Sequence, residues 1–499
     1  PLHCEQKLQL GDPQIGTRGK ALMFILILGI GGSFQTGFHN TAMSSPSPYI
    51  KNFINSSWYE RYEEYPPSAT VNLIFGVIIS TYAVGGLFGA ASVKFATGKF
   101  GRKKILIGTC LFSVVGGVIM LTSKNANSFE MIVAARSMNG FGAGLGGSVQ
   151  QIYLMESSPK QLRSTLMLSN VFFLSLGKLS GQVLGLSVLL GREHLWNILL
   201  FAPACLVVVQ LLALPFFPEA PRYLLMDGGD IVACRKALQR LWGPGEYQVE
   251  IDEMLAERAA SKGVQVKSLL EFLQDSGIRS QIIAIAILSA CIQLSGMSAI
   301  STFSFDILNK AAVPVDQIRY ITLGFGVSEV LATITSTLIV ERSGRKPLLL
   351  GGFSIMFTML LLITIMLNLK NPAPWVAYCT AALFMIFIMC VSGGPSGVNM
   401  ALINDSFEQS HHPAAMTLNG LQKWGQFAVL GLVFPFINEG LGSYCFLLFA
   451  CFCLLGALYS FFLVPETKGK SPKEVSQQFK RLAVGGKFFG RNQFMETRL

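Results

Sequence analysis

The stretch "GKFGRKKIL" begins at Gly98, and a close echo of it, "ERSGRKPLL", begins at Glu341. Each stretch sets a tight cluster of positive charge between long apolar runs, once in each half of the chain. The Gly-Arg-Lys triplet that starts at Gly101 returns 243 residues later at Gly344. A charge cluster that recurs in the same apolar setting indicates that the unit around it recurs as well.

The composition is that of a membrane protein. Of 499 residues, 51% are hydrophobic and 13% are charged, and that charged share is about half of what soluble domains carry. Several apolar runs, such as 105–121 and 348–367, approach the ~20 residues that span a bilayer. The net charge of +11 gathers in the connections and the C-terminal tail, so it indicates membrane topology and no nucleic acid. Most cysteines lie in apolar runs and are expected to be buried free thiols.

Breaks at charged or Gly/Pro-rich positions divide the chain into twelve predicted spans of about 20 residues or more. The first apolar run is read as a span because it is long and lacks a small-x-small cleavage site. The predicted spans are 21–44, 71–97, 104–122, 130–154, 165–190, 195–217, 280–310, 318–340, 348–367, 374–403, 414–438 and 441–464.

Lysine and arginine alternate between rich and poor connections, which predicts that the rich connections and both termini are cytoplasmic. Residues 45–69 are then outside, and there Asn55-Ser56-Ser57 matches a glycosylation sequon. Segment 218–279 has apolar residues at helical spacing between charges, which predicts a cytoplasmic helical linker. The expected domains are the tail 1–20, a bundle 21–217, the linker 218–279, a second bundle 280–464 and the tail 465–499.

Two more pairs repeat at nearly the same spacing as the glycines. Glu219 precedes Glu466 by 247 residues, and Glu156 precedes Asp405 by 249. The chain is therefore interpreted as a duplicated six-span unit, an organisation found in many secondary transporters.

The ordered motifs resemble those of the major facilitator superfamily, and within it the sugar porters. The segments "GGSFQTGFHN", "GQVLGL", "QLSG" and "HPAA" are similar to animal facilitative hexose carriers of the second class, which include fructose carriers and a urate carrier. The motifs are the two Gly-Arg-Lys triplets, Arg136-x3-Gly140-x3-Gly144, Tyr153-x2-Glu156-x2-Pro159-x3-Arg163, Pro218-Glu219-Ala220-Pro221-Arg222 and Pro465-Glu466-Thr467-Lys468-Gly469. The resemblance implies the major facilitator fold, an all-α membrane protein of twelve transmembrane helices in two six-helix bundles.

The resemblance also implies a cytoplasmic latch, in which charges at the span ends pair across the two bundles when the outside is open. The family usually has arginine where His412 stands and glutamate where Asp405 stands, so the stronger latch is expected in the repeat with Glu156 and Arg163. The expected latch residues are Gly101, Arg102, Lys103, Glu156, Arg163, Glu219, Arg222, Glu341, Gly344, Arg345, Lys346, Asp405 and Glu466.

A hexose needs amides, hydroxyls and an aromatic side chain facing a cavity near the midplane. By resemblance, Gln182 and Gln293 are expected to hydrogen-bond sugar hydroxyls, and Trp424 to stack on the sugar ring; helix bridging or core packing are the alternatives. Ser298 stands where glucose carriers have asparagine, and Ile292 where they have a second glutamine.

Two charges depart further from the glucose-type pattern: Glu329 and Lys423 stand where that pattern has asparagine. Because an unpaired charge within a membrane is costly, they are expected to pair with each other. The alternative is that Lys423 contacts an anionic or strongly polar substrate.

The function expected from these features is facilitative uniport of a hexose, such as fructose or glucose, through a plasma membrane by alternating access. Span one has no acid of the kind found in proton-coupled porters, and His39 within it is expected to be a neutral packing residue. A carrier of urate or another organic anion and a non-transporting sugar sensor remain as alternatives. No nucleotide-binding loop or paired hydrolytic carboxylates stand out, so neither an enzyme nor a cofactor or metal is expected.

Overall fold

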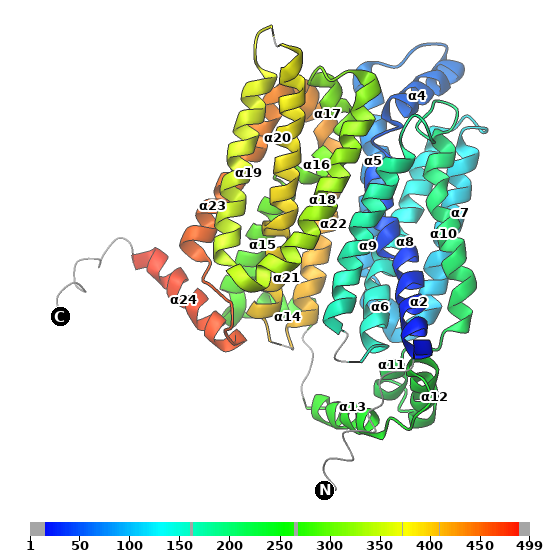
Figure 1. Ribbon diagram of the computed structural model, residues 1–499, viewed down its shortest axis with the longest axis vertical. Helices are drawn as coiled ribbons and strands as arrows, with labels where there is room; N and C mark the ends of the chain where they lie inside the picture. Colours follow the sequence, from blue (N-terminus) through cyan, green and yellow to red (C-terminus); the bar gives the residue numbers. More distant parts are fainter. Residues whose placement is uncertain (1–14, 160–162, 264–267, 372, 409, 489–499) are drawn as a thin grey trace, which may run out of the picture.

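The computed structural model describes residues 15–159, 163–263, 268–371, 373–408 and 410–488, without the side chains of 15–18, 21, 163–168, 341 and 484–488. Within these ranges all regular structure is helical, and Figure 1 shows long helices standing side by side. In chain order the helices make twelve passes, six in each of two bundles. The expected all-α fold of two six-helix bundles is confirmed.

Passes one to six form the first bundle. Their helices are α2 (Ile15–Gly31) with α3 (Ser33–Ala42), α5 (Ser68–Ala91), α7 (Lys103–Ser123), α8 (Phe129–Glu156), α9 (Arg163–Leu184) and α10 (Trp196–Ala213). Short helices lie at its two ends: α4 (Ser47–Tyr62), α6 (Val93–Phe100) and η2 (Leu214–Phe216).

Passes seven to twelve form the second bundle. Their helices are α15 (Arg279–Gln293) with α16 (Met297–Thr302), α18 (Val315–Ser343), α19 (Lys346–Leu367), α20 (Pro374–Gly393) with α21 (Pro395–Ser406), α22 (His412–Leu441) and α23 (Cys445–Leu463). Shorter elements accompany them: η3 (Ser276–Ile278), α17 (Ser304–Lys310), η4 (Gly442–Tyr444) and the terminal α24 (Pro472–Phe488).

The outer faces of the bundles are apolar, as a bilayer requires. On α7, Leu111, Phe112 and Val115 are 52%, 43% and 49% exposed. Nine stretches of described helix are long and apolar enough to cross a membrane, and α8 and α9 are not among them. These two helices carry glycines and polar side chains turned toward neighbouring helices, which lowers their mean hydropathy. Every cysteine that the structure describes is a free thiol, as expected, but Cys205 and Cys451 are exposed rather than buried.

Three of the twelve passes are broken near their middles. Pass one breaks at Gly32 and pass ten at Gly394, which precedes Pro395. Pass seven breaks at Gly296, which has a φ of 92° that a residue with a side chain rarely adopts. Non-helical backbone inside a membrane is tolerated where protein or water satisfies it, and carriers use such breaks near their substrate sites.

The linker folds into helices, as its periodicity predicts. It contains α11 (Pro221–Met226), α12 (Ile231–Trp242), α13 (Gln248–Ser261) and α14 (Leu269–Gln274). Leu225, Cys234, Leu238 and Ile251 form a small core between α11, α12 and α13. Figure 1 places these three helices together below the first bundle; this side of the molecule is called the linker end, and the opposite side the α4 end.

Close contact between α5 and α8 explains the Gly140-x3-Gly144 spacing. A Cβ on Gly140 would lie 2.0 Å from the Tyr82 carbonyl oxygen, and one on Gly144 would lie 2.3 Å from that of Gly86. Neither backbone can withdraw without moving a whole helix. These glycines therefore serve packing within the first bundle, as small residues commonly do between membrane helices.

Gly144→Ala is expected to lower the free energy of unfolding by about 1–3 kcal/mol, because an added methyl group forces two backbones apart. Gly147→Ala is the matched control on the same helix, since nothing lies within 4 Å of its Cβ position. The control should be neutral or stabilising by up to about 1 kcal/mol. Thermal unfolding of both variants in detergent measures the difference, and equal stability would contradict the assigned contact.

Candidate functional site

An ion pair joins the two bundles within the membrane-spanning region. Lys178 on α9 donates a hydrogen bond of 2.7 Å from Nζ to Oε1 of Glu329 on α18. The two side chains are 18% and 10% exposed, so the pair is largely shielded from water. One turn along α9, Gln182 also reaches α18, because its Oε1 lies 1.8 Å from the position of a Cβ on Gly326. Helices α9 and α18 thus form one seam between the bundles.

The expected Glu329–Lys423 ion pair is wrong, because Glu329 pairs with Lys178 instead. Lys178 was not predicted as a site residue, although it lies within span five and four residues before Gln182. Residues four apart share a face of a helix, so this spacing was a usable signal. Lys178 reaches Glu329 because α9 packs directly against α18.

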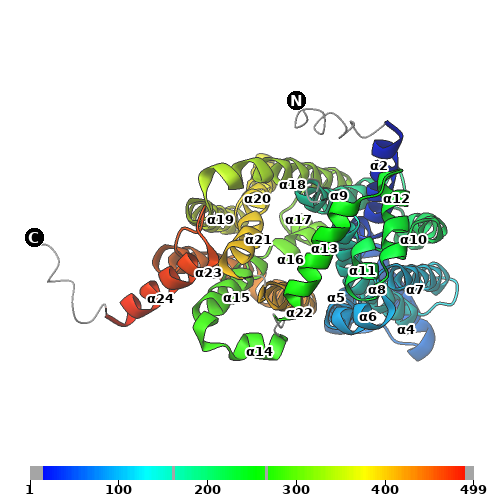
Figure 2. The ribbon, with the colours of Figure 1, turned by 90° about the horizontal axis from the view of Figure 1, so that it is seen from below.

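Lys423 lies near the middle of α22 and forms no hydrogen bond or ion pair with any described residue. Its charge interacts with those of Lys178 and Glu329 without direct contact. Figure 2 shows α22 beside α5, and α9 beside α18 across the interface. The Lys423 side chain is solvent-exposed, while the charges acting on it belong to the far seam. It therefore points into the space between the α9–α18 seam and a second seam, formed by α5 and α22.

The residues expected to contact a sugar lie on both bundles. Gln182 is buried on α9, and its Oε1 has no hydrogen-bond partner. Gln293 ends α15 beside the break in pass seven, and its Oε1 accepts a hydrogen bond of 3.3 Å from Ser298. Trp424 packs between α22 and α5, where its ring centre lies 5.9 Å from that of Tyr82.

Two polar clusters in equivalent positions of the repeats were not predicted. In the first bundle, Asn170 Oδ1 accepts hydrogen bonds of 3.0 Å from both Ser33 Oγ and Gln150 Nε2. In the second, Asn419 Oδ1 accepts from Ser289 Oγ at 2.9 Å and from Asn399 Nδ2 at 3.3 Å.

The offset already known from the latch acids relates these two clusters. Gln150 precedes Asn399 by 249 residues, and Asn170 precedes Asn419 by 249. The same offset separates Glu156 from Asp405. Applying it to mid-span polar residues would have found both clusters in the sequence.

At the α4 end, polar contacts join the bundles. Lys51 Nζ lies 3.0 Å from Oδ2 of Asp306, which also accepts a hydrogen bond of 3.4 Å from Ser47. Nearby, Arg319 donates to Ser45 Oγ at 2.9 Å and to the Ser45 carbonyl oxygen at 3.0 Å. These contacts link the α3–α4 region of the first bundle to α17 and α18 of the second.

At the linker end, the charge clusters of the two repeats adopt the same geometry. Arg102 donates to Glu156 from Nε and Nη2 at 2.9 Å each, and Arg345 Nε donates to Asp405 at 2.9 Å. Gly101 and Gly344 take φ values of 82° and 79°, so both positions favour glycine. The duplication inferred from sequence therefore extends to individual hydrogen bonds.

The two Pro-Glu motifs also match. Glu219 accepts a hydrogen bond of 3.2 Å from the Lys103 N–H at the start of α7, and Glu466 accepts one of 3.0 Å from the Arg345 N–H before α19. Each carboxylate meets the partial positive charge of a helix N-terminus. Burial opposes ionisation of Glu466, but several backbone N–H groups together hold its pKa below the usual value.

Among the described residues, these linker-end charges do not pair across the bundles. Arg102 and Arg345 each bind an acid of their own bundle, and Arg222 pairs with Glu257 inside the linker at 2.5 Å. The described residues therefore form no cross-bundle latch of the kind expected for a state open at the outside. The side chains of Arg163 and Glu341 lie outside the described residues.

The predicted glycosylation sequon lies in α4 rather than in a loop. Asn55 is half-buried, and Ser57 is fully buried with its hydroxyl donating to Asn127 Oδ1 at 2.9 Å. Glycosylation at Asn55 stays a prediction.

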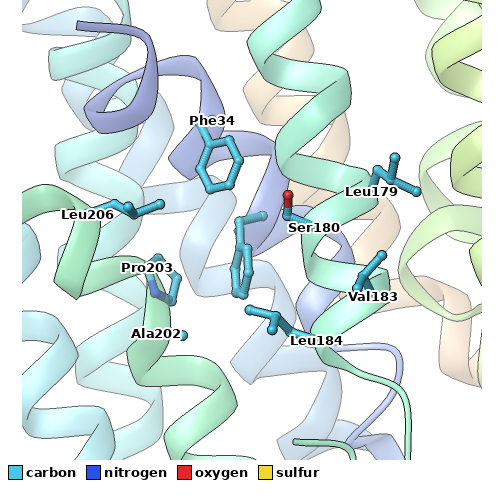
Figure 3. Close-up of a pocket in the computed structure, with 9 residues that line it drawn as sticks. Phe34, Leu179, Ser180, Val183, Leu184, Ala202, Pro203 and Leu206 are labelled. Atoms are coloured by element: carbon cyan, nitrogen blue, oxygen red, sulfur yellow. The ribbon is translucent and has the colours of Figure 1, made fainter. Parts of the chain in front are cut away.

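An apolar cavity of about 360 Å³ lies within the first bundle, between α3, α9 and α10. Figure 3 shows Phe34, Leu179, Pro203 and Leu206 around it, with the Ser180 hydroxyl as a polar group. Pro203 interrupts the α10 hydrogen-bond ladder beside this cavity. Since a hexose needs several hydrogen-bonding partners, this lining does not suit one.

Comparison with known proteins gives consistent matches. The model of the "Sugar (and other) transporter" family matches residues 24–479. Mouse solute carrier family 2, facilitated glucose transporter member 9 is 38% identical over 95% of this chain and 89% of its own length. Human member 11 is 38% identical over 92% and 93% of the two chains, and horse member 5 is 38% identical over 92% and 91%.

Solved structures share the fold. The xylose transporter XylE from E. coli, in an inward open conformation, superposes with a TM-score of 0.75 over 93% of this chain and 99% of its own, at 17% identity. XylE bound to 6-bromo-6-deoxy-D-glucose superposes with a TM-score of 0.70 over 93% and 100%, at 18% identity.

Removing one partner of the Lys178–Glu329 pair should leave an uncompensated charge within the membrane region. Glu329→Gln and Lys178→Met are each expected to cost about 3–5 kcal/mol of stability. The double variant should cost less than the two single costs together, with a coupling of about 1–3 kcal/mol.

Thermal unfolding of the purified variants in detergent measures this cycle. Lys370→Met serves as the control, because Lys370 is exposed, and it should leave stability within about 0.5 kcal/mol of the parent. Strict additivity of the two single costs would show that the pair does not couple the bundles.

Proposed function

The chain belongs to the sugar transporter family, and we propose from this premise that it is a facilitative carrier of hexoses such as fructose or glucose. Uniport by alternating access is the proposed mechanism. The support is a set of hydrogen-bonding side chains presented by both bundles at mid-span. Gln182 comes from the first bundle, and Gln293 with Ser298 comes from the second.

The state of these groups suits a polyhydroxylated substrate. The Gln182 Oε1 is buried against Gly326 of α18 and lacks a partner, so a shift of the α9–α18 contact would make it available to a sugar hydroxyl. Gln293 and Ser298 bond weakly to each other at 3.3 Å, so a sugar can replace that contact. Trp424 is half-buried, and Glu329 and Lys423 add charge to the proposed site. Such moderate contacts allow release as well as binding.

The contacts between the bundles are consistent with alternating access. At the α4 end, Lys51 and Asp306 hold the bundles together, whereas the described charges at the linker end stay within their own bundle or the linker. We place the linker end and both termini in the cytoplasm and the α4 end outside, in a plasma membrane. This structure then represents a state closed toward the outside.

Two observations bear on the driving force and the alternatives. Span one contains no acid between residues 21 and 44, which favours uniport over proton coupling. Lys423 has no partner among the described residues, which keeps a carrier of urate or another organic anion as the second candidate. A non-transporting sugar sensor would bind the sugar without moving it.

Breaking the outer contact should shift the conformational equilibrium. Asp306→Asn is expected to favour opening of the α4 end by about 1 kcal/mol, roughly a fivefold change in population, because the lost pair is only partly buried. Spin labels at Asn52 and Val315, both exposed and on opposite bundles, report this as longer distances. Exposed Cys205 and Cys451 are first replaced by serine.

Lys51→Glu combined with Asp306→Lys should restore the parent distances, because the pair is re-formed in reverse. Lys124→Met is the control at the same end, since Lys124 donates to the Glu193 carbonyl within the first bundle. Unchanged distances in Asp306→Asn would remove this pair from the proposed gate.

Uptake into proteoliposomes tests the function. Labelled fructose or glucose should enter saturably and at the same rate with or without a proton gradient. Gln182→Ala should reduce uptake about tenfold through loss of a hydrogen bond to the sugar. Uptake that needs the gradient would contradict uniport, and saturable binding without uptake would indicate the sensor.

A further inference from the structure

The space between the bundles carries an excess of positive charge. Lys178 and Lys423 face a single acid, Glu329, and these three side chains interact electrostatically. Because Lys178 occupies Glu329 at 2.7 Å, the charge of Lys423 is left over. A neutral hexose does nothing to balance it.

Among the described residues, Lys178 and Glu329 are the charged groups that act on Lys423, so no second acid balances its charge. Its chain neighbour Trp424 packs against Gly86, where a Cβ would lie 2.4 Å from the Trp424 ring. Beyond Trp424 lies Tyr82, and the buried guanidinium of Arg136 sits 4.5 Å from the centre of the Tyr82 ring. The described contacts on the Trp424 side therefore bring a further cation, Arg136, and no acid.

A cation held among protein dipoles without a counter-charge is costly. Lys423 avoids part of this cost by remaining exposed to solvent in the space between the seams. When a substrate displaces that solvent, the cost returns unless the substrate brings a negative charge. An anionic group beside Lys423 would remove it and form a charge-assisted hydrogen bond.

We propose that Lys423 is an anion-binding residue of the substrate site and that the carrier accepts polyhydroxylated monocarboxylates, the sugar acids. The inference rests on the proposed function and narrows its substrate class. Lys423 would bind the carboxylate, while the amides and Trp424 would hold the hydroxylated body.

The remaining polar groups favour a hydroxylated anion over an apolar one. Gln182 offers an unpartnered oxygen that needs a donor such as a hydroxyl group, and an apolar acid would leave it unsatisfied. Gln293 and Ser298 can both donate and accept hydrogen bonds. One charge also suffices, since Lys178 keeps Glu329 as its partner.

The test uses the full chain in proteoliposomes, with labelled D-glucuronate, D-gluconate, urate and D-fructose as probes. Binding of each probe to the detergent-purified protein is measured in parallel by calorimetry. Glucuronate or gluconate is expected to bind and enter saturably and to compete with fructose. Lys423→Asn should lower the ratio of sugar-acid to fructose uptake at least tenfold, the loss expected for one charged hydrogen bond.

Two further variants separate charge from folding. Lys423→Arg keeps the cation and should retain the uptake ratio within about threefold, whereas Lys370→Asn removes an exposed lysine and should leave it unchanged. The uptake of each probe is divided by the amount of folded protein, which is measured by size-exclusion chromatography. If Lys423→Arg lowered the ratio of sugar-acid to fructose uptake as much as Lys423→Asn does, the site would select its substrate by shape rather than by charge. That result would overturn the inference.

The outcomes distinguish this inference from the proposed function. Fructose uptake without binding or uptake of either sugar acid would overturn the inference and leave the hexose carrier standing. Sugar-acid binding that Lys423→Asn abolishes, without uptake of any probe, would support the inference and refute transport. Urate uptake without sugar-acid uptake would overturn the proposed substrate class.

Discussion

The structure depends on one constraint: polar groups inside a membrane must find their partners within the protein. The Lys178–Glu329 pair meets it across the bundle interface, and the Asn170 and Asn419 clusters meet it within each bundle. Because the ion pair and each cluster combine side chains from different helices, they determine which helices must be neighbours. The apolar surface facing lipid gives no comparable specificity, since lipid tails and leucine are equally apolar.

The two bundles repeat one six-helix arrangement. Matching hydrogen bonds show how closely the second bundle preserves the contacts of the first. Arg102 and Arg345 each bind an acid of their own bundle and a backbone carbonyl five residues earlier. Differences between the repeats concentrate where they face each other. Lys178 and Lys423 have no charged equivalents at the corresponding distance of 249 residues, so the asymmetric charge belongs to the interface rather than to the shared scaffold.

The sequence predicted the spans, the linker helices and the repeat, because each leaves a regular signal in hydropathy, charge or spacing. It also indicated that Glu329 and Lys423 need explanation. It did not identify the partner of Glu329, since an ion pair across two bundles depends on how helices far apart in the chain face one another. The breaks at Gly32 and Gly394 were missed for a similar reason: glycine is common in membrane helices, and only packing decides which glycine ends one.

The place of each cross-bundle contact along its helices sets what it can do during transport. Lys51 and Asp306 lie at the α4 end, so in the proposed alternating-access cycle they must separate before a substrate can pass. Glu329 lies near the middle of α18, where the proposed rocking would move the helices least. The Lys178–Glu329 pair can therefore persist while the ends open in turn, as a pivot that keeps its two charges satisfied. Because Lys178 occupies the acid that acts on Lys423, a pivot of this kind would leave the charge of Lys423 available to a substrate.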